Sequence, residues 1–349
     1  MGDSEARGGR TGTYPLRAVT IRDVATHAGV SAMTVSRVLN DGKGMREDTR
    51  QRVQRAIDEL GYIPNLVARD LSRRRTGSLA ILVPDIGNSF FTLIVRGAAE
   101  VARAAGYRVV LCHTEGNLSV EADYLRDGAG NRVEGFLAAP VGDESYEHFQ
   151  SLQRRRVPFV LLDRSIPGLA ADQVQGDNRL AGEQLVGRLL HLGHRRVAIV
   201  GGSPGISSTR ERVAGYRAAL AAAGIDPDAG VVIPTEGHDV DAGREVAPQV
   251  LALDPAVTAV FAINNLVALG ILLAARQAGV EIPRDLALVC VDDIEHASLL
   301  DPFLTVARQP ADRYGRIAMR MLLDRIEGFV GPPRTVELRP ELVIRRSCG

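Results

Sequence analysis

From residue 79 onward, short apolar runs alternate along the chain with longer amphipathic stretches. The apolar runs predict strands at Leu79–Val83, Val109–Cys112, Gly135–Ala139, Phe159–Leu162, Val197–Val200, Val231–Ile233, Val260–Ala262 and Leu286–Val291. The intervening stretches predict helices such as Phe91–Ala105, Leu180–His191, Arg210–Ala223 and Asn265–Ala278. This alternation indicates right-handed β-α-β units and parallel sheets covered on both faces. Because these strands are too many for one sheet, we expect two α/β lobes.

Before this region, residues 19–40 have the pattern of two short helices joined by a tight turn. Thr20 can cap the first helix with Asp23 as its reciprocal partner, and Ser31 can cap the second helix. Gly29 permits the turn between them. The second helix has an apolar side for packing and a polar, cationic side that carries Arg37. A helix-turn-helix that enters a DNA major groove needs this division.

Two more segments follow before the α/β region begins. Apolar positions at helical spacing predict a third helix over residues 46–60. Residues 64–71 are prone to form a helix that is too short to be stable alone, and residues 72–77 form a charged linker. We therefore predict a disordered tail at residues 1–18, a helix-turn-helix domain at 19–63 and a hinge helix with linker at 64–77.

An ordered series of motifs accompanies these elements. In chain order they are Val19–Asn40, Thr49-Arg50, Gly61–Asn65, Ala68–Leu71, Leu82–Asp85, Asn88–Phe91, Leu192–Arg196, Ala214–Tyr216 and Asp292-Asp293. The series resembles the lactose-repressor family of bacterial transcription regulators over nearly the whole chain. One departure is Arg46, where the family usually has a capping serine, although Gly44 or Asp41 could substitute.

The resemblance implies an N-terminal all-α helix-turn-helix head and an α/β, two-lobed effector domain like that of periplasmic binding proteins. It also implies three crossings between the lobes, which we place near Asp177, Thr305 and Pro332. The effector-binding and dimerisation domain then covers residues 78–346, with a proximal lobe at 78–176 and 306–332 and a distal lobe at 177–305 and 333–346. Ligands of open α/β sheets bind beyond the carboxyl ends of the strands, so we expect the site in a cleft between the lobes.

The resemblance also assigns DNA contacts. A guanidinium at Arg37 can reach guanine O6 and N7 together, whereas the apolar Ala32 and Met33 are expected to pack against thymine methyl groups or sugar. In the family, a leucine matching Leu71 inserts into the minor groove and kinks the operator, and we favour this role over that of a linker leucine buried under the next domain. Phosphate contacts are expected from Thr20, Ser31, Thr34, Ser36 and Asn40, and groove contacts around the wedge from Asn65, Ala68 and Arg69.

A second set of polar residues lies at predicted strand ends and crossings. The expected effector-binding residues are Asp85, Phe90, Phe91, Asp163, Arg212, Asp239, Asn264, Asp292 and Gln309. Carboxylates, carboxamides and an arginine suit a ligand with many hydroxyl groups, and family members bind sugars, nucleosides or purines at these positions. Several relatives have an aromatic residue where this chain has His238 and Asp239, which favours a sugar over a purine held between two rings. Asn265, where aspartate is usual, either removes a charge near the cleft or only changes a helix cap.

Charge distribution supports a nucleic-acid partner although the net charge is zero. Residues 1–75 contain 14 Lys and Arg against 9 Asp and Glu, so a basic head precedes an acidic body. No run approaches the roughly 20 apolar residues of a membrane span, and the N-terminal sequence is no secretory signal. Three dispersed cysteines favour reduced thiols in a cytoplasmic protein.

No catalytic constellation emerges from the sequence. The loop Gly201–Gly205 lacks the endings of nucleotide-binding motifs, the adjacent Asp292 and Asp293 have no paired nucleophile, and His191 and His194 flank a helix-stopping glycine. We therefore expect no enzyme activity, no cofactor and no metal. The favoured hypothesis is a cytoplasmic, homodimeric regulator, usually a repressor in this family, that binds a pseudo-palindromic operator. The alternatives are a two-lobed sugar receptor without a DNA role and a regulator that responds to a nucleoside or purine.

Overall fold

The computed structural model describes residues 19–39, 45–62, 76–130, 133–294 and 303–349. The chain divides into two units, residues 1–75 and 76–349. Several predictions therefore lie outside the described residues: the tail, the hinge segment up to residue 75, and the assigned DNA contacts Asn40, Asn65, Ala68, Arg69 and Leu71.

The described residues of the first unit form three helices, α1 (Ile21–Ala28), α2 (Ala32–Leu39) and α3 (Glu47–Leu60). They pack around a small core that includes Val24, Val35 and Val53, each with no exposed surface. The predicted capping is confirmed: the Asp23 amide donates to the Thr20 hydroxyl, and the Asp23 carboxylate accepts from the Thr20 amide at 2.8 Å. Gly29 ends α1 with a left-handed φ of 64°. The helix-turn-helix is thus built as its sequence predicts.

Arg46 stands at the N-cap of α3, and its side chain makes no capping hydrogen bond. The proposed substitutes Gly44 and Asp41 lie outside the described residues. Glu47 and Asp48 in the first turn place negative charge beside the positive end of the helix dipole. The start of α3 is therefore stabilised by charge, and no side-chain cap from Arg46 contributes.

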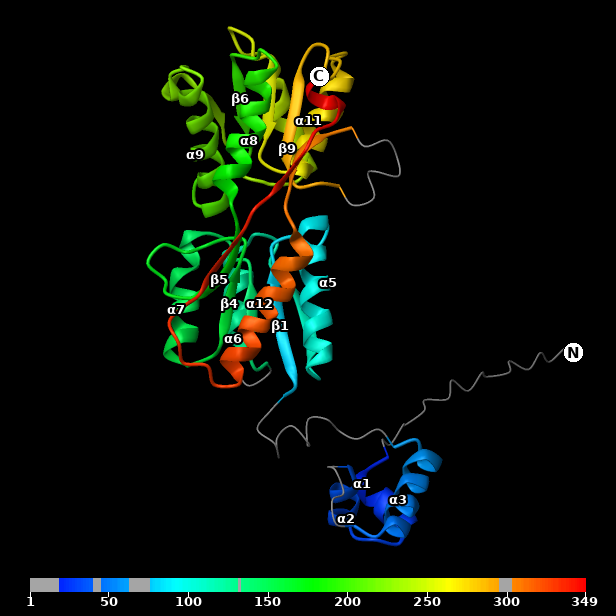
Figure 1. The fold of residues 1–349 in the computed structure, drawn as a ribbon. Coiled ribbons are helices and arrows are strands. Elements are labelled where there is room, and N and C mark those ends of the chain that lie inside the picture. The colour runs from blue at the N-terminus through cyan, green and yellow to red at the C-terminus, as the bar shows by residue number, and fades with distance from the viewer. Residues whose placement is uncertain (1–18, 40–44, 63–75, 131–132, 295–302) are drawn as a thin grey trace, which may run out of the picture. The chain divides into compact units, whose positions relative to one another are not determined.

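In the second unit, one lobe is built on a six-stranded sheet with the order β11-β5-β4-β3-β1-β2 (Figure 1). Its strands are β1 (Ser78–Val83), β2 (Arg108–His113), β3 (Phe136–Ala138), β4 (Phe159–Leu162), β5 (Asp172–Gly176) and β11 (Thr335–Leu338). Helices α5 (Ser89–Ala104) and α12 (Ala311–Ile326) cover one face, and α6 (Leu118–Ala129) and α7 (Tyr146–Arg154) cover the other. The strands of this sheet are all parallel.

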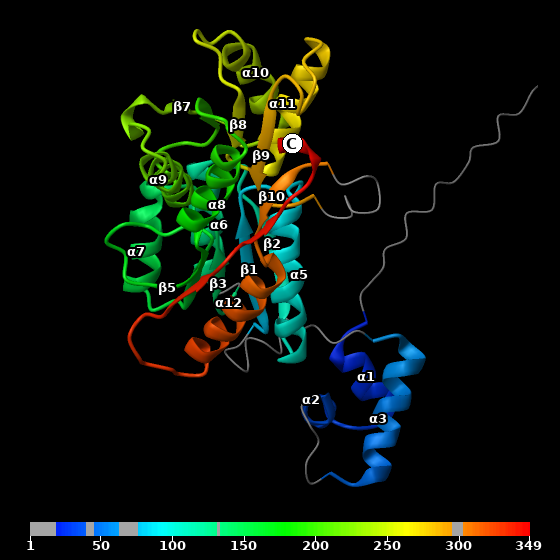
Figure 2. The same cartoon turned by 45° about the horizontal axis from the view of Figure 1, so that its top comes forward.

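The other lobe repeats this arrangement on a sheet with the order β12-β10-β9-β8-β6-β7 (Figure 2). Its strands are β6 (Val197–Val200), β7 (Val231–Ile233), β8 (Ala259–Ala262), β9 (Ala287–Val291), β10 (Thr305–Arg308) and β12 (Glu341–Val343). Its helices are α8 (Asn178–His191), α9 (Ser207–Ala222), α10 (Val240–Leu251) and α11 (Asn265–Gln277). Strands of equal place in the two sheets, such as β4 and β9, are therefore structural equivalents, although β12 pairs antiparallel to β10.

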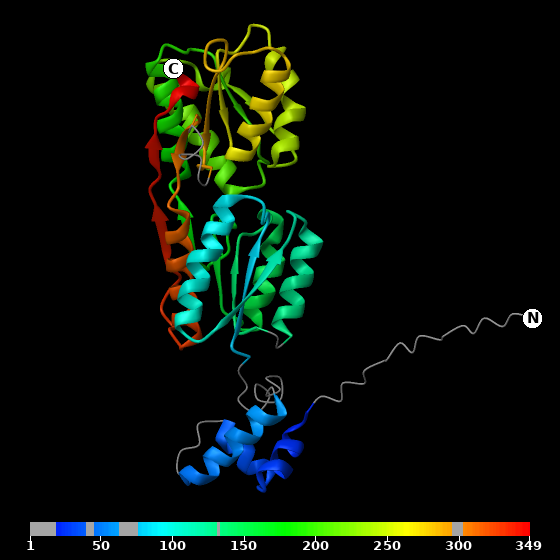
Figure 3. The same cartoon turned by 90° about the vertical axis from the view of Figure 1, so that its right-hand side faces the viewer.

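The chain crosses between the lobes three times, as predicted, but two crossings lie elsewhere than expected (Figure 3). β10 belongs to the second sheet, so the crossing follows Arg308 and residues 306–308 are not part of the first lobe. β11 pairs with β5, so the last crossing lies between Leu338 and Glu341 and not near Pro332. Both corrections have one cause: each of these crossings follows a strand, β10 or β11, that the sequence analysis did not predict.

Helices α8 and α9 approach each other closely because each has a glycine at their contact. A Cβ atom added to Gly182 would lie 2.5 Å from the Arg212 carbonyl oxygen, and one added to Gly215 would lie 2.1 Å from the Arg179 carbonyl oxygen. No side chain fits at such distances without separating the two helices. This contact fixes the position of α9 and hence of the residues that α9 carries.

Candidate functional site

The exposed side of α2 is the candidate nucleic-acid interface. Val35 is buried against the head core, whereas Arg37 is exposed and Met33 exposes 74% of its surface. The Ser31 and Thr34 hydroxyls lie 2.9 Å apart, and the Thr20 hydroxyl donates to the Asp23 carboxylate. These three hydroxyls therefore serve the local fold of the head. A phosphate contact by any of them stays a prediction.

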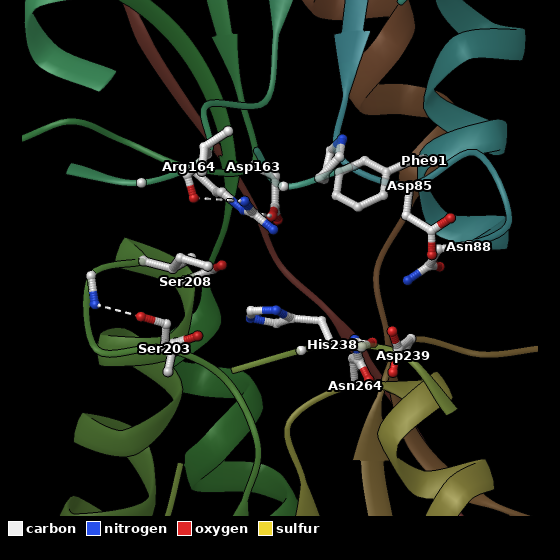
Figure 4. Close-up of a pocket in the computed structure, with 18 of the residues that line it drawn as sticks. Asp85, Asn88, Phe91, Asp163, Arg164, Ser203, Ser208, His238, Asp239 and Asn264 are labelled. Atoms are coloured by element: carbon white, nitrogen blue, oxygen red, sulfur yellow. Dashed lines mark hydrogen bonds and ion pairs between the residues drawn. The ribbon is translucent and has the colours of Figure 1, made fainter. Parts of the chain in front are cut away.

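A cavity of about 540 Å³ lies between the two lobes of the second unit. Eight of the nine expected effector residues line it: Asp85, Phe90, Phe91, Asp163, Arg212, Asp239, Asn264 and Asp292. Figure 4 shows side chains of both lobes facing this space, with Phe91 and Asp163 on one side and His238 and Asn264 on the other. The ninth, Gln309, is not part of the lining. It is buried behind Asp292, donates to that carboxylate at 2.8 Å and accepts from the Tyr314 hydroxyl at 2.6 Å.

Asp163 and Asp292 occupy equivalent places in the two lobes. Each directly follows its strand, β4 or β9, and each amide donates to the neighbouring strand, at 2.9 Å for Asp163 and 3.0 Å for Asp292. Both residues have left-handed backbone, with φ of 61° and 70°. Such conformations are uncommon outside glycine, although aspartate tolerates them better than most residues. The backbone therefore turns one buried carboxylate from each lobe toward the cleft.

Arg212 on α9 is a buried cation whose charge acts on the Asp292 carboxylate. Its Nε donates to the Asn178 Oδ1 atom and its Nη1 to the Ile263 carbonyl oxygen, both at 2.8 Å. Burial raises the pKa of Asp292 to about 6, while Arg212 and the hydrogen bond from Gln309 lower it. Desolvation thus exceeds the attraction of the nearby charge.

Arg164 is a cleft residue that the predicted site omitted. Its Nη1 donates to the Pro140 and Val141 carbonyl oxygens at 2.9 and 3.1 Å, which fixes the guanidinium against the first lobe. Its Nε and the Oδ1 of Asp163 are buried without a hydrogen-bond partner among the described residues. Its place directly after Asp163 was the available signal, because adjacent residues beyond a strand can both reach a cleft when the backbone turns sharply.

His238 and Asp239 are adjacent residues with different roles in the cleft: Asp239 caps a helix, whereas the Nε2 atom of the His238 imidazole is buried. The Asp239 carboxylate caps α10 by accepting from the Ala242 amide at 2.8 Å, so the Asp239 side chain is partly engaged in the fold. The Asn264 carboxamide donates to the His238 carbonyl oxygen at 2.8 Å. Burial and the nearby Arg164 and Arg212 lower the pKa of His238 to about 4, so the imidazole is neutral at physiological pH. Its Nε2 has no partner within the described chain.

Comparison with known proteins identifies the family to which this chain belongs. The model described as "Bacterial regulatory proteins, lacI family" matches residues 20–65, and a periplasmic binding protein-like domain model matches residues 186–348. The HTH-type transcriptional repressor PurR of Photobacterium profundum is 34% identical over 329 residues, covering 94% of this chain and 98% of the relative. This chain belongs to the lacI family of bacterial transcription regulators.

Solved structures agree with this membership. The transcriptional regulator CelR in complex with cellobiose is 33% identical, with a TM-score of 0.71 over 94% of this chain and 99% of that one. The lac repressor dimer bound to operator and the anti-inducer ONPF is 26% identical, with a TM-score of 0.81 over 95% and 99%. This chain is therefore a DNA-binding transcriptional regulator with a helix-turn-helix head and a two-lobed domain of the periplasmic-binding-protein type.

We also searched the described residues for membrane-spanning helices and for metal-binding clusters. Within the described ranges, no helix is both long and apolar enough to cross a membrane. In the same part of the chain, no three His, Cys, Asp or Glu side chains gather in the way a metal site requires.

Separating the two units should separate their functions. A fragment of residues 76–349 retains the hydrophobic cores of both lobes and every residue that lines the cleft. We expect it to unfold cooperatively with the ligand affinity of the full chain and to show no specific DNA affinity. Circular dichroism, calorimetry and gel-shift titration measure the three properties. Specific DNA binding by the fragment would contradict the assignment of DNA recognition to the head.

Proposed function

We propose that this regulator responds to a small, uncharged, hydroxyl-rich ligand, a sugar, bound between the lobes. The observation that carries the proposal is the charge balance of the inner cleft. Asp163 and Asp292 bring one carboxylate from each lobe, and Arg164 and Arg212 bring one guanidinium from each lobe. A hydroxyl group donates to a carboxylate and accepts from a guanidinium, so a polyhydroxylated ligand can satisfy both kinds of group without carrying charge.

Unpartnered polar atoms support the same interpretation. Asp163 Oδ1, Arg164 Nε and His238 Nε2 come from both lobes and lack hydrogen-bond partners among the described residues. Buried polar groups in folded proteins are nearly always paired, so we expect these atoms to form hydrogen bonds with a ligand or with water. The relative CelR is known in complex with cellobiose, which is consistent with a sugar.

A nucleoside or purine is the second candidate. Figure 4 shows the Phe91 ring and the His238 imidazole on opposite sides of the pocket, so a flat base could lie between them. The imidazole is a smaller ring than the aromatic residue of several relatives, and the buried carboxylates call for several donors. Both observations favour the sugar.

On the DNA side, we propose that Arg37 contacts guanine while Ala32 and Met33 make apolar contacts in the major groove. A homodimer would present two heads to a pseudo-palindromic operator, consistent with the lac repressor dimer bound to its operator. A ligand that binds one arrangement of the lobes better than another then changes operator affinity through the same equilibrium.

The test is isothermal titration calorimetry of the full chain against sugars, polyols, nucleosides and purines. We expect a sugar to bind, and operator affinity measured with and without it to differ. A purine or nucleobase as the only ligand would contradict the sugar assignment while leaving the two-lobed site intact. A bound sugar without any change in DNA affinity would contradict the proposed coupling.

A further inference from the structure

The two lobes are joined beside the cleft by an ion pair that lies outside the three chain crossings. Asp143 begins the short 3₁₀ helix Asp143–Ser145 in the first lobe, and Arg210 lies on α9 in the second. Arg210 Nη1 lies 2.8 Å from Asp143 Oδ2, and Arg210 Nη2 lies 3.1 Å from Asp143 Oδ1. The pairing is therefore bidentate, which specifies a relative orientation of the two groups as well as an attraction.

Each partner is held by its own lobe. Arg210 Nη1 also donates to the Pro204 carbonyl oxygen at 2.8 Å, which ties the guanidinium to the loop before α9. On the other side, the Val141 amide donates to the buried Glu121 carboxylate at 2.8 Å, and Arg164 binds the carbonyl oxygens of the same loop. Because the Arg210 guanidinium is already held by its own lobe, and the loop that carries Asp143 is anchored to its lobe, pairing them costs less side-chain entropy than pairing two free side chains.

Two further hydrogen bonds accompany the ion pair. The Asp143 amide donates to the Gly205 carbonyl oxygen at 3.0 Å, and the Ser165 amide donates to the Ser207 hydroxyl at 2.8 Å. A Cβ atom at Gly142 would lie 3.2 Å from the Gly205 carbonyl oxygen, so the loops after β3 and β6 are in close contact. Together these interactions join the two lobes on this side of the cleft.

The equivalent loops on the opposite side of the cleft are not joined. They follow β1 and β8, the structural counterparts of β6 and β3. Among the described residues, no hydrogen bond or ion pair links Asp85 or Asn88 to Asn264 or Asn265. The Asn88 carboxamide caps α5 and that of Asn264 binds the His238 carbonyl oxygen, each within its own lobe.

We propose that Asp143 and Arg210 form a clasp that holds the lobes together on one side of the cleft when no effector is bound. The clasp sets the spacing of the lobes, so Asp143 and Arg210 are positioning residues for the effector site. The opposite side, where Asp85 and Asp239 line the cavity, is then the side that opens to admit the effector. This proposal is independent of the chemical class of the ligand.

Distance measurement between the lobes tests the clasp in the full chain without ligand. Spin labels at Glu147→Cys on α7 and Glu211→Cys on α9 report on the clasped side, since both positions are exposed and the three native cysteines are buried. We expect a single narrow distance distribution. Arg210→Met, which keeps an unbranched side chain without the charge, and Asp143→Asn should each broaden it and move it to longer distance.

Two matched variants make the result specific. Exchange of the charges in Asp143→Arg with Arg210→Asp should restore the narrow distribution, which a merely local structural role would not. Glu183→Gln, which removes the exposed Arg179–Glu183 pair within α8, should leave the distribution unchanged. A wild-type distribution that is already broad, or one that neither Arg210→Met nor Asp143→Asn changes in a folded protein, would overturn the proposal.

Discussion

Replacement of Arg37 by alanine should remove specific operator binding while leaving ligand affinity intact. Arg37 lies on α2 and is exposed, whereas Val35 of the same helix is buried in the head core. A bidentate contact between a guanidinium and guanine contributes about 1–3 kcal/mol of discrimination, or roughly 5-fold to 150-fold in affinity. The ligand cavity lies in the other unit and should not respond.

Gel-shift titration against the selected operator and against random DNA measures this discrimination. Arg55→Ala is the matched control, because Arg55 is an exposed arginine on α3, which is not the predicted recognition helix. If Arg55 binds a phosphate, its removal would weaken binding to all DNA sequences alike. If Arg37→Ala kept the full preference for operator over random DNA, Arg37 would not be a base-reading residue.

Asp292→Asn should lower effector affinity at least tenfold and stabilise the protein without ligand. Asparagine keeps the size of the side chain and tolerates the left-handed backbone at this position, where φ is 70°. A hydrogen bond to a charged group contributes about 1.5–3 kcal/mol, and the neutral carboxamide forfeits much of it. Operator binding should be retained while the response to ligand is lost.

The gain in stability follows from the pKa of Asp292. Its value of about 6 in the folded protein lies above the ordinary 3.8, so burial of the charged form costs stability at neutral pH. At about 1.4 kcal/mol per pKa unit, the cost is on the order of 3 kcal/mol at most. It is present above pH 6 and declines as the pH falls through 6 toward 4, because the native state then takes up a proton.

Thermal unfolding of wild type and Asp292→Asn between pH 4 and pH 8, with calorimetry of ligand binding, measures both effects. The variant should unfold at higher temperature at pH 7.5, and the difference should shrink as the pH approaches 4. Asp312→Asn is a suitable control, since Asp312 lies on α12 away from the cleft and pairs with Arg316. Unchanged ligand affinity in Asp292→Asn would remove this residue from the site.

The strands that sequence analysis predicted are those whose apolar runs are continuous. β1, β4, β8 and β9 are buried on both faces and give a clear signal. β5, with the sequence DQVQG, and β11, with TVEL, have no continuous apolar run, and neither was predicted. β10 was not predicted either, and without β10 and β11 the last two chain crossings could not be located correctly.

The cleft residues were predictable where one residue follows a clear strand, as Asp163 and Asp292 do. Gln309 was misplaced by the same logic, because the strand before it was not recognised and its side chain turns behind Asp292. Arg164 follows Asp163 directly and His238 precedes Asp239, so their positions were visible in the sequence, but only the structure shows that Arg164 Nε and His238 Nε2 have no hydrogen-bond partner among the described residues. Which atoms lack partners is a three-dimensional property that no spacing along the chain reveals.

Because α8 and α9 are in close contact, mutations outside the cleft should also abolish the response to the effector. A single methyl group at Gly182 or Gly215 would push α9 outward, and with it Arg212, whose Nε is matched to Asn178 on α8 at 2.8 Å. Neither glycine lines the cavity. Cells carrying such an allele would keep a regulator that still occupies its operator but no longer answers its signal, and a selection for non-responding mutants should return these two codons alongside those of the cleft itself.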